Sequence, residues 1–119
     1  MQKVLVVDDS IFQRKNICSV LVAAGFEIIE AENGRVGLEK VASSSPNLIM
    51  TDLLMPEMDG IQFLAALREN NNTVPVFVLT SDIQENKREQ CLDLGAAGFL
   101  SKPLCKAELL DAFSRVASV

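Results

Sequence analysis

The segment Asn47–Gly60, NLIMTDLLMPEMDG, decides the fold and the candidate chemistry of this 119-residue chain. Its apolar run ends at Asp52, and Pro56 and Gly60 then interrupt regular structure, which predicts a strand with an acid at its exit. In a parallel sheet, that exit is the edge where loops collect binding and catalytic groups. A single aspartate at such a place is more often a turn residue that hydrogen-bonds within its own loop. The role of Asp52 therefore depends on the residues at the ends of the other strands.

On both sides of this segment, β-rich runs alternate with helical patterns. We expect strands at residues 3–7, 26–31, 48–52, 74–80 and 97–101. We expect helices at about residues 10–24, 34–43, 60–68, 82–94 and 106–117. Alternation of this kind, without repeats or linkers, predicts an α/β fold with a parallel sheet, right-handed crossovers and helices on both faces.

Single residues mark where the helices begin and end. Gly25 and Gly95 are expected to close the first and fourth helices, Asp59 to cap the third, and Ser81 or Asp82 to cap the fourth. The apolar positions expected to face the core are Ile11, Cys18, Leu21 and Val22 in the first helix, and Leu109, Leu110, Phe113 and Val116 in the last.

The composition fits one domain, residues 1–119, whose sheet is buried on both faces, since 49% of its residues are hydrophobic. No apolar run approaches the ~20 residues of a membrane span, and no signal-peptide pattern opens the chain, so we expect a cytoplasmic protein with no membrane partner. A net charge of −5 argues against nucleic-acid binding by this domain.

Histidine is absent, which excludes Ser-His-Asp catalysis, Cys-His catalysis and imidazole metal sites. Any phosphohistidine chemistry would need a histidine supplied by another molecule. The cysteines, Cys18, Cys91 and Cys105, are odd in number and widely spaced, so neither a disulfide framework nor a zinc site is indicated. We expect small buried thiols.

The residues at the ends of the predicted strands form one chemical set. Asp8 and Asp9 follow the first strand, and only the second strand, ending near Ala31-Glu32, contributes nothing obvious. Three carboxylates at one edge repel one another without a cation, and hard oxygen ligands select Mg²⁺ or a similar ion. A hydroxyl and an ammonium complete what phosphoryl transfer to a carboxylate oxygen requires. The other members of the set are Asp52, Thr80 and Lys102.

Each member also has an ordinary structural interpretation when taken alone. Asp8 and Asp9 can cap a helix, Thr80 can be a turn residue, and Lys102 can be a solvated lysine. Their joint occurrence at the ends of four predicted strands favours the functional interpretation.

The motifs VVDDS, MTDLLMPEMDG, VLTSD and FLSKP resemble those of the response-regulator receiver domain of two-component signalling, the CheY-like family, along the whole chain. The resemblance implies a flavodoxin-like, doubly wound sheet of five parallel strands in the order 2-1-3-4-5 with five helices. It further implies a phosphorylation-activated switch, more than an enzyme, that catalyses only its own phosphorylation and dephosphorylation.

The resemblance also implies a role for each site residue. Asp52 would be the phosphoacceptor. Asp9, Asp52 and the backbone carbonyl of Leu54 would bind Mg²⁺ directly, and Asp8 would act through water. Thr80 and Lys102 would contact the phosphoryl oxygens, with the Lys102-Pro103 peptide bond cis.

Partners and output follow from the same resemblance. The phosphodonor would be a histidine kinase or a histidine phosphotransfer protein, the receiver of the signal a downstream target protein or output domain, and the chain a monomer or a phosphorylation-dependent dimer. The switch would run from Thr80 to Phe99, which stands where many relatives have tyrosine. Leu54 and Asp82 occupy positions that, in the family this chain resembles, influence hydrolysis of the acyl phosphate. The implied output surface consists of Gln84, Arg88, Cys91, Phe99 and Lys106.

Other functions are compatible with this fold class. A flavin or nucleotide binder would need a phosphate-binding loop after the first strand, where Asp8-Asp9 would repel phosphate. An aspartate-based phosphatase would place two acids one residue apart there, whereas Asp8 and Asp9 are adjacent. A degenerate receiver used only for docking would not need the complete set of acids, hydroxyl and lysine.

Overall fold

The computed structural model describes residues 2–53, 55, 57–80, 85–102 and 104–117 of the chain. The strands are β1 (Lys3–Val7), β2 (Glu27–Ala31), β3 (Leu48–Asp52), β4 (Val76–Thr80) and β5 (Gly98–Ser101). The helices are α1 (Ile11–Ala23), α2 (Gly34–Ser44), α3 (Gly60–Glu69), α4 (Glu85–Asp93) and α5 (Lys106–Ala117). All strands pair in parallel in the order β2-β1-β3-β4-β5, which confirms the expected topology.

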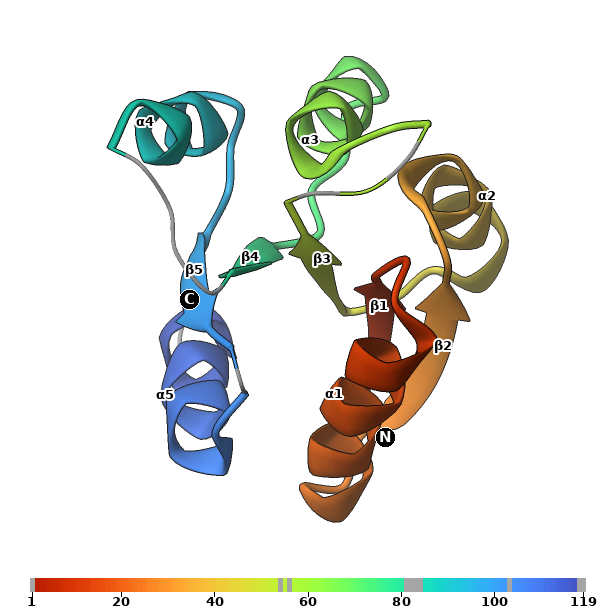
Figure 1. Cartoon of the computed structure of the whole chain (residues 1–119), viewed down its shortest axis with the longest axis vertical. Coiled ribbons are helices and arrows are strands. Elements are labelled where there is room, and N and C mark those ends of the chain that lie inside the picture. Colours follow the sequence, from red (N-terminus) through yellow and green to blue (C-terminus); the bar gives the residue numbers. More distant parts are fainter. Residues whose placement is uncertain (1, 54, 56, 81–84, 103, 118–119) are drawn as a thin grey trace.

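The sheet lies between two helical layers, with α1 and α5 on one face and α2, α3 and α4 on the other (Figure 1). Strand β1 shows why, since Val4 and Val6 belong to the apolar cluster under α1 and α5, and Leu5 and Val7 to the cluster under the other helices. All four are fully buried. A strand buried on both faces must be apolar at every position, which accounts for the run KVLVV.

The helix ends expected at Gly25, Asp59 and Gly95 are confirmed, and Asp59 forms a reciprocal capping box with Gln62. The cap of α1 is Ser10, which was not among the expected caps and accepts a hydrogen bond from the Gln13 backbone N–H. Gly25 closes the loop after α1 with a φ of 94°, a conformation that glycine adopts without strain. Ser81 and Asp82, the expected caps of α4, lie outside the described residues.

Several buried positions were predicted wrongly. Ile11, Val22 and Leu110 are 63%, 61% and 46% exposed, because the helices that carry them turn only one narrow face toward the sheet. Cys105 is exposed as well, whereas burial raises the pKa of the Cys18 thiol to about 11. The side chains of Phe113 and Val116 are outside the described part.

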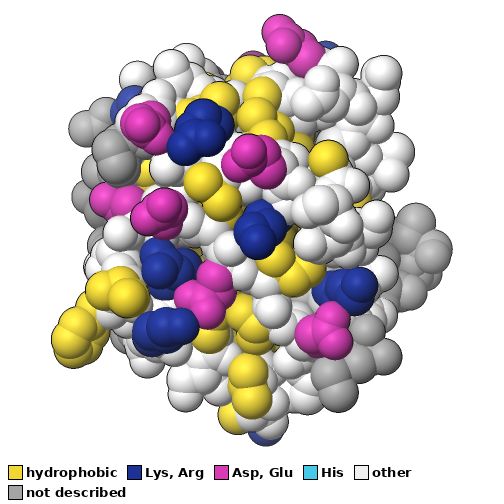
Figure 2. Space-filling view, turned by 90° about the vertical axis from the view of Figure 1, so that its right-hand side faces the viewer, with side chains coloured by type: hydrophobic (Ala, Val, Ile, Leu, Met, Phe, Trp, Pro, Cys, Tyr) yellow, Lys and Arg dark blue, Asp and Glu magenta, His cyan; other side chains and the backbone are white. Residues whose placement is uncertain are grey.

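Surface charge is mixed on the side of the molecule that carries the β2 edge. Figure 2 shows lysine and arginine interspersed with aspartate and glutamate there, and apolar side chains between them. A continuous basic surface, which a nucleic-acid backbone would require, is not seen on the described part of this face. In the described residues, no helix combines the length and the apolar character needed to cross a bilayer.

Candidate phosphoacceptor site

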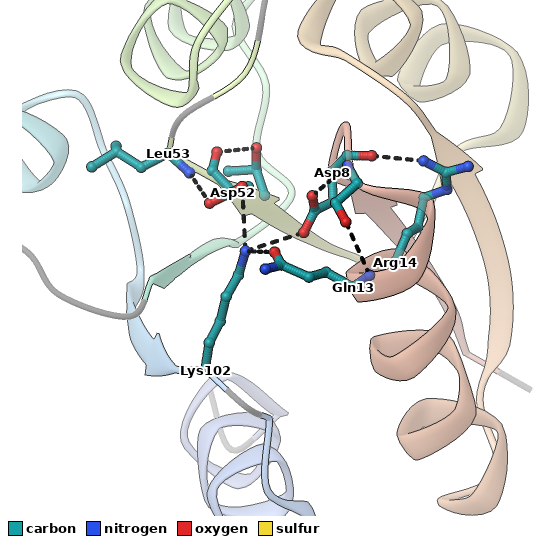
Figure 3. A network of polar contacts seen from close by, with 8 residues as sticks. Asp8, Gln13, Arg14, Asp52, Leu53 and Lys102 are labelled. Carbon is teal, nitrogen blue, oxygen red and sulfur yellow. Dashed lines mark hydrogen bonds and ion pairs between the residues drawn. The ribbon is translucent and has the colours of Figure 1, made fainter.

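The parallel register brings the ends of four strands to one edge of the sheet. Val7 pairs with Thr51, Asp52 with Leu79, and Thr80 with Ser101, so the residues at or just after these positions share the carboxyl edge. Asp8, Asp52 and Lys102 converge there (Figure 3). This is the edge at which the sequence places the candidate chemistry.

Lys102 is the centre of the polar network. Its Nζ lies 3.2 Å from Asp8 Oδ2 and 3.2 Å from Asp52 Oδ2. It also donates to Gln13 Oε1 at 2.5 Å. The Lys102 side chain is only 12% exposed, and those of Asp8 and Asp52 are 1% and 15% exposed. Solvent therefore screens these charges weakly, and the ammonium is held between two carboxylates.

The two aspartates that contact Lys102 use their oxygens in the same way. In each, one oxygen accepts from a nearby backbone N–H, Ser10 N at 3.0 Å for Asp8 and Leu53 N at 2.8 Å for Asp52. The other oxygen faces Lys102. The backbone thus fixes the rotation of both carboxylates, and one oxygen of Asp52 stays directed into the site.

The loop after Asp52 folds back tightly on the strand end. Gly60 N donates to Leu53 O at 2.8 Å, and a Cβ at Gly60 would lie 2.6 Å from the carbonyl oxygen of Asp52. Only glycine permits this approach of two backbone segments. The start of α3 is thereby packed directly against the strand end that carries the candidate phosphoacceptor.

Asp8, Asp9 and Asp52 form a group that could hold a metal ion, with one oxygen of each within 4.8 Å of the others. Asp8 is buried, Asp52 is half-buried and Asp9 is exposed. Three carboxylates without nitrogen or sulfur ligands fit a hard divalent cation that keeps part of its water shell, and Mg²⁺ is the common choice. The donor set therefore fits the metal that the sequence implies.

Electrostatics at Asp52 favour such a cation. Burial raises the pKa of Asp52 above its ordinary value of 3.8, and the Asp8 carboxylate adds to this effect, against the opposing influence of Lys102 and the Leu53 N–H. The protein alone thus makes the ionised carboxylate more costly than it is in water. A nucleophilic carboxylate must be ionised, and a bound cation would favour that form.

Three residues on α1 and β2 that the sequence analysis did not identify stabilise the position of Asp8. Arg14 donates to the backbone carbonyl of Asp8 at 2.7 Å and to Glu30 at 2.8 Å, and Lys15 pairs with the same Glu30 at 2.9 Å. Strand β2 therefore contributes Glu30, one residue before its end. An arginine in the helical turn after the acid pair was the available signal, but its reach to β2 depends on the sheet order.

Comparison with known proteins assigns the family. The chain matches the model of the response regulator receiver domain over residues 4–114. It belongs to that family. Receiver domains are the switches of phosphorylation-dependent two-component signalling, and this chain is a switch of that class.

The relatives of this receiver domain differ in length. It is 34% identical to the chemotaxis protein CheY of Bacillus subtilis over 114 residues, with 95% of both proteins covered. It is 42% identical over 105 residues to the protein-glutamate methylesterase/protein-glutamine glutaminase of Treponema denticola, of which it spans only 28%. A solved structure of Vibrio cholerae CheY4 matches 98% of each chain with a TM-score of 0.90 and 36% identity.

The predicted switch and output residues of this receiver domain are only partly brought together. Half-buried Thr80 ends β4, and half-buried Phe99 lies on β5 with the guanidinium of Arg88 4.6 Å from the centroid of its ring. Lys106 is exposed at the start of α5. Cys91 is fully buried, so its prediction as an output contact was wrong. It lies on the side of α4 that packs into the apolar cluster with Val78 and Phe63.

Four predictions fall on residues outside the described part. These are the Leu54 carbonyl as a metal ligand, the Lys102-Pro103 peptide bond, Asp82 as an influence on hydrolysis and Gln84 as an output contact.

Proposed function

We propose that Asp52 is the residue that this receiver domain phosphorylates, with the phosphoryl group supplied by a phosphohistidine of a histidine kinase or phosphotransfer protein. The observation that carries the proposal is the Asp52 carboxylate, held by Leu53 N–H on one oxygen and facing Lys102 with the other. The donor histidine belongs to the partner, because this chain contains none.

In the proposed reaction, an oxygen of Asp52 attacks phosphorus and forms the O–P bond of an acyl phosphate. The P–N bond of the phosphohistidine breaks, and its electron pair goes to the departing imidazole. Lys102 neutralises charge on the phosphoryl oxygens, and Thr80 donates a hydrogen bond to one of them. Hydrolysis returns the domain to its unphosphorylated form: water attacks phosphorus, the O–P bond to Asp52 breaks with its electron pair returning to the carboxylate, and inorganic phosphate leaves. The domain thus acts on itself alone.

Asp8, Asp9 and Asp52 are the residues that would hold Mg²⁺, with Asp8 acting through water as the sequence implies. When bound, the ion supplies charge neutralisation for phosphoryl transfer. Asp8 has a second role in this proposal before a metal ion binds. Its Oδ2 lies 3.2 Å from Lys102, so it keeps the ammonium next to the acceptor carboxylate in the metal-free site.

Phosphorylation would be transmitted from Thr80 to Phe99 and read by partners at the exposed face of β5, α4 and α5. New phosphoryl oxygens give the Thr80 hydroxyl a charged acceptor, and its inward movement leaves space for the Phe99 ring. Arg88, Phe99 and Lys106 remain candidates for this surface. The cytoplasmic location and the oligomeric state stay predictions, which cell fractionation and sedimentation would test.

The test compares wild type with Asp52→Asn and with Glu39→Gln, a control at a residue whose side chain is 67% exposed. Each protein is incubated with MgCl₂ and acetyl phosphate, or with a phosphorylated kinase, and its intact mass is measured. We expect one phosphoryl group on wild type and on the control, labile to hydroxylamine as acyl phosphates are, and none on Asp52→Asn. Equal incorporation by all three proteins would refute the assignment.

A further inference from the structure

The Lys102 ammonium has three N–H groups, and the structure offers three acceptors for them. Two are carboxylate oxygens, Asp8 Oδ2 and Asp52 Oδ2, each at 3.2 Å. The third is the amide oxygen of Gln13, Oε1, at 2.5 Å. Figure 3 shows the Gln13 side chain extending from the start of α1 to the end of the Lys102 side chain.

Metal binding and phosphoryl transfer would weaken some of these three contacts and leave another unchanged. Asp8 and Asp52 belong to the acidic group that would hold the metal, so a bound divalent cation would compete with the ammonium for their oxygens. Asp52 also loses carboxylate charge when it becomes an acyl phosphate. Gln13 is neutral and outside that group, so neither change removes its contact with Lys102.

The backbone of Gln13 is fixed in a way that suits this role. Its N–H donates to the Ser10 side chain at 3.3 Å in the N-terminal cap of α1, and Ser10 N–H donates to Asp8 Oδ1 at 3.0 Å. The helix end that carries Gln13 is thereby hydrogen-bonded to the loop after β1 that carries Asp8 and Asp9. The side chain itself is exposed, so water competes for its amide and the expected effect is moderate.

We propose that Gln13 is a positioning residue. Its amide oxygen holds the Lys102 ammonium at the carboxyl edge of the sheet when a metal ion and a phosphoryl group replace the contacts of that ammonium with Asp8 and Asp52. The proposal rests on the proposed function, since it gives Gln13 a part in phosphoryl transfer to Asp52. Gln13 does not touch the reacting atoms and acts through Lys102.

The first experiment uses acetyl phosphate, which is too small to depend on docking to the surface of α1. Gln13→Met keeps the length of the side chain and removes the acceptor. We expect it to slow phosphorylation about three- to tenfold at saturating MgCl₂, the effect of losing one hydrogen bond to a charged group at an exposed site. Gln13→Glu, which restores an acceptor, should recover most of the rate. Asn16→Ala, an exposed change on the same helix, should leave the rate unchanged.

A second experiment separates positioning from a general effect on folding. In the Lys102→Ala background, Gln13→Met should cause no further loss, because its route to the site is already gone. In metal-free protein, the NMR signal of the Lys102 side-chain Cε–Hε group should shift in Gln13→Met and stay in place in Asn16→Ala.

The proposal is overturned if Gln13→Met slows the Lys102→Ala protein as much as it slows wild type, or if it changes neither the rate nor the Lys102 signal. Where phosphorylation of Lys102→Ala is too slow to measure, the NMR comparison decides. If wild type takes up no phosphoryl group at all, the proposed function fails, and the same NMR comparison still decides whether Gln13 holds Lys102.

Discussion

Two corners of the sheet edge are built from different interactions. The β1 corner, formed by Asp8, Arg14, Lys15 and Glu30, is joined by charged hydrogen bonds of 2.7 to 2.9 Å. The β5 corner, formed by Thr80, Arg88 and Phe99, contains a cation on an aromatic ring at 4.6 Å.

Charged hydrogen bonds of a weakly exposed side chain such as Arg14 fix positions, whereas the cation–π contact of the half-buried Arg88 and Phe99 contributes about 0.5–1 kcal/mol and is readily rearranged. Under the proposed function, the two corners would have different tasks. The β1 corner would hold the acidic residues in place for the metal ion and the phosphoryl group, and the β5 corner would change its conformation when the site is occupied. Asp52 and Lys102 lie between them.

The largest expected effect comes from removing the anchor of the β1 corner. Arg14→Ala leaves Glu30 and the Asp8 carbonyl without this half-buried donor, and we expect a loss of about 2 kcal/mol in the free energy of unfolding. Lys15→Ala is the matched control. Although Lys15 lowers the pKa of Glu30 more than Arg14 does, its side chain is 62% exposed, so solvent screens the pair and the loss should be roughly 0.5 kcal/mol or less.

Urea denaturation of both variants measures this difference in the free energy of unfolding. Its pH dependence shows at which pH the ionised Glu30 stabilises the fold. The folded-state pKa of Glu30 is lowered from 4.5, so its stabilisation is present above that value and is lost as the pH falls through the folded-state pKa. The gap between wild type and Arg14→Ala should therefore narrow in acid. Equal losses in Arg14→Ala and Lys15→Ala would contradict the role given to Arg14.

The next effect concerns metal affinity. Asp9→Ala removes a direct ligand in the proposed site and should weaken Mg²⁺ binding about tenfold or more, whereas Glu39→Ala, on the exposed face of α2, should not change it. Calorimetric titration of EDTA-treated protein with MgCl₂ measures both. An unchanged affinity in Asp9→Ala would place the metal elsewhere and would remove the chemical reason for a rigid β1 corner.

A smaller effect, of opposite sign, is expected at Asp52 in metal-free buffer. Because its folded-state pKa is raised, the ionised carboxylate opposes folding as the pH rises above the unfolded value of 3.8 and through the folded-state pKa. Asp52→Asn should therefore raise Tm by roughly 2–5 °C at neutral pH without metal, and the gain should disappear in acid. Thermal melts in EDTA across pH test this, and a lower Tm for Asp52→Asn at neutral pH would contradict it.

The sequence predicted the site residues whose positions follow from the end of a strand. It did not predict contacts that depend on how a helix is rotated or on how far a long side chain extends. Asp8, Asp52 and Lys102 could be placed together because parallel strands bring their carboxyl ends to one edge. Gln13 and Arg14 were missed, because the contacts of a long side chain across elements leave no periodic pattern.

The same limit explains the errors of burial. Ile11, Val22 and Leu110 all lie on helices, and apolar spacing alone does not fix which way a helix is turned against the sheet. Cys91 was assigned to the output surface by analogy of position, yet its own helix turns it inward. The inner strands β1, β3 and β4 escaped this problem because both of their faces are covered.

The smallest expected effect is on the β5 corner, where Arg88→Ala removes the cation over the Phe99 ring. We expect a loss of about 0.5–1 kcal/mol in stability, together with a change in the distribution of ring conformations. The cation favours whichever ring position lies beneath it, so its removal should let phosphorylation shift the ring more completely. Thr80→Ala should do the opposite, because Asp52 can still be phosphorylated while the signal to Phe99 is lost.

Aromatic NMR signals of Phe99, with and without beryllofluoride as a mimic of the acyl phosphate, measure both changes. In wild type, the ring signal should move on addition of the mimic. It should move further in Arg88→Ala and stay in place in Thr80→Ala, while signals of Glu30 in the β1 corner shift little in all three. Equal shifts at Glu30 and Phe99 in wild type would mean that the two corners move together, and that the difference in their bonding does not divide their tasks.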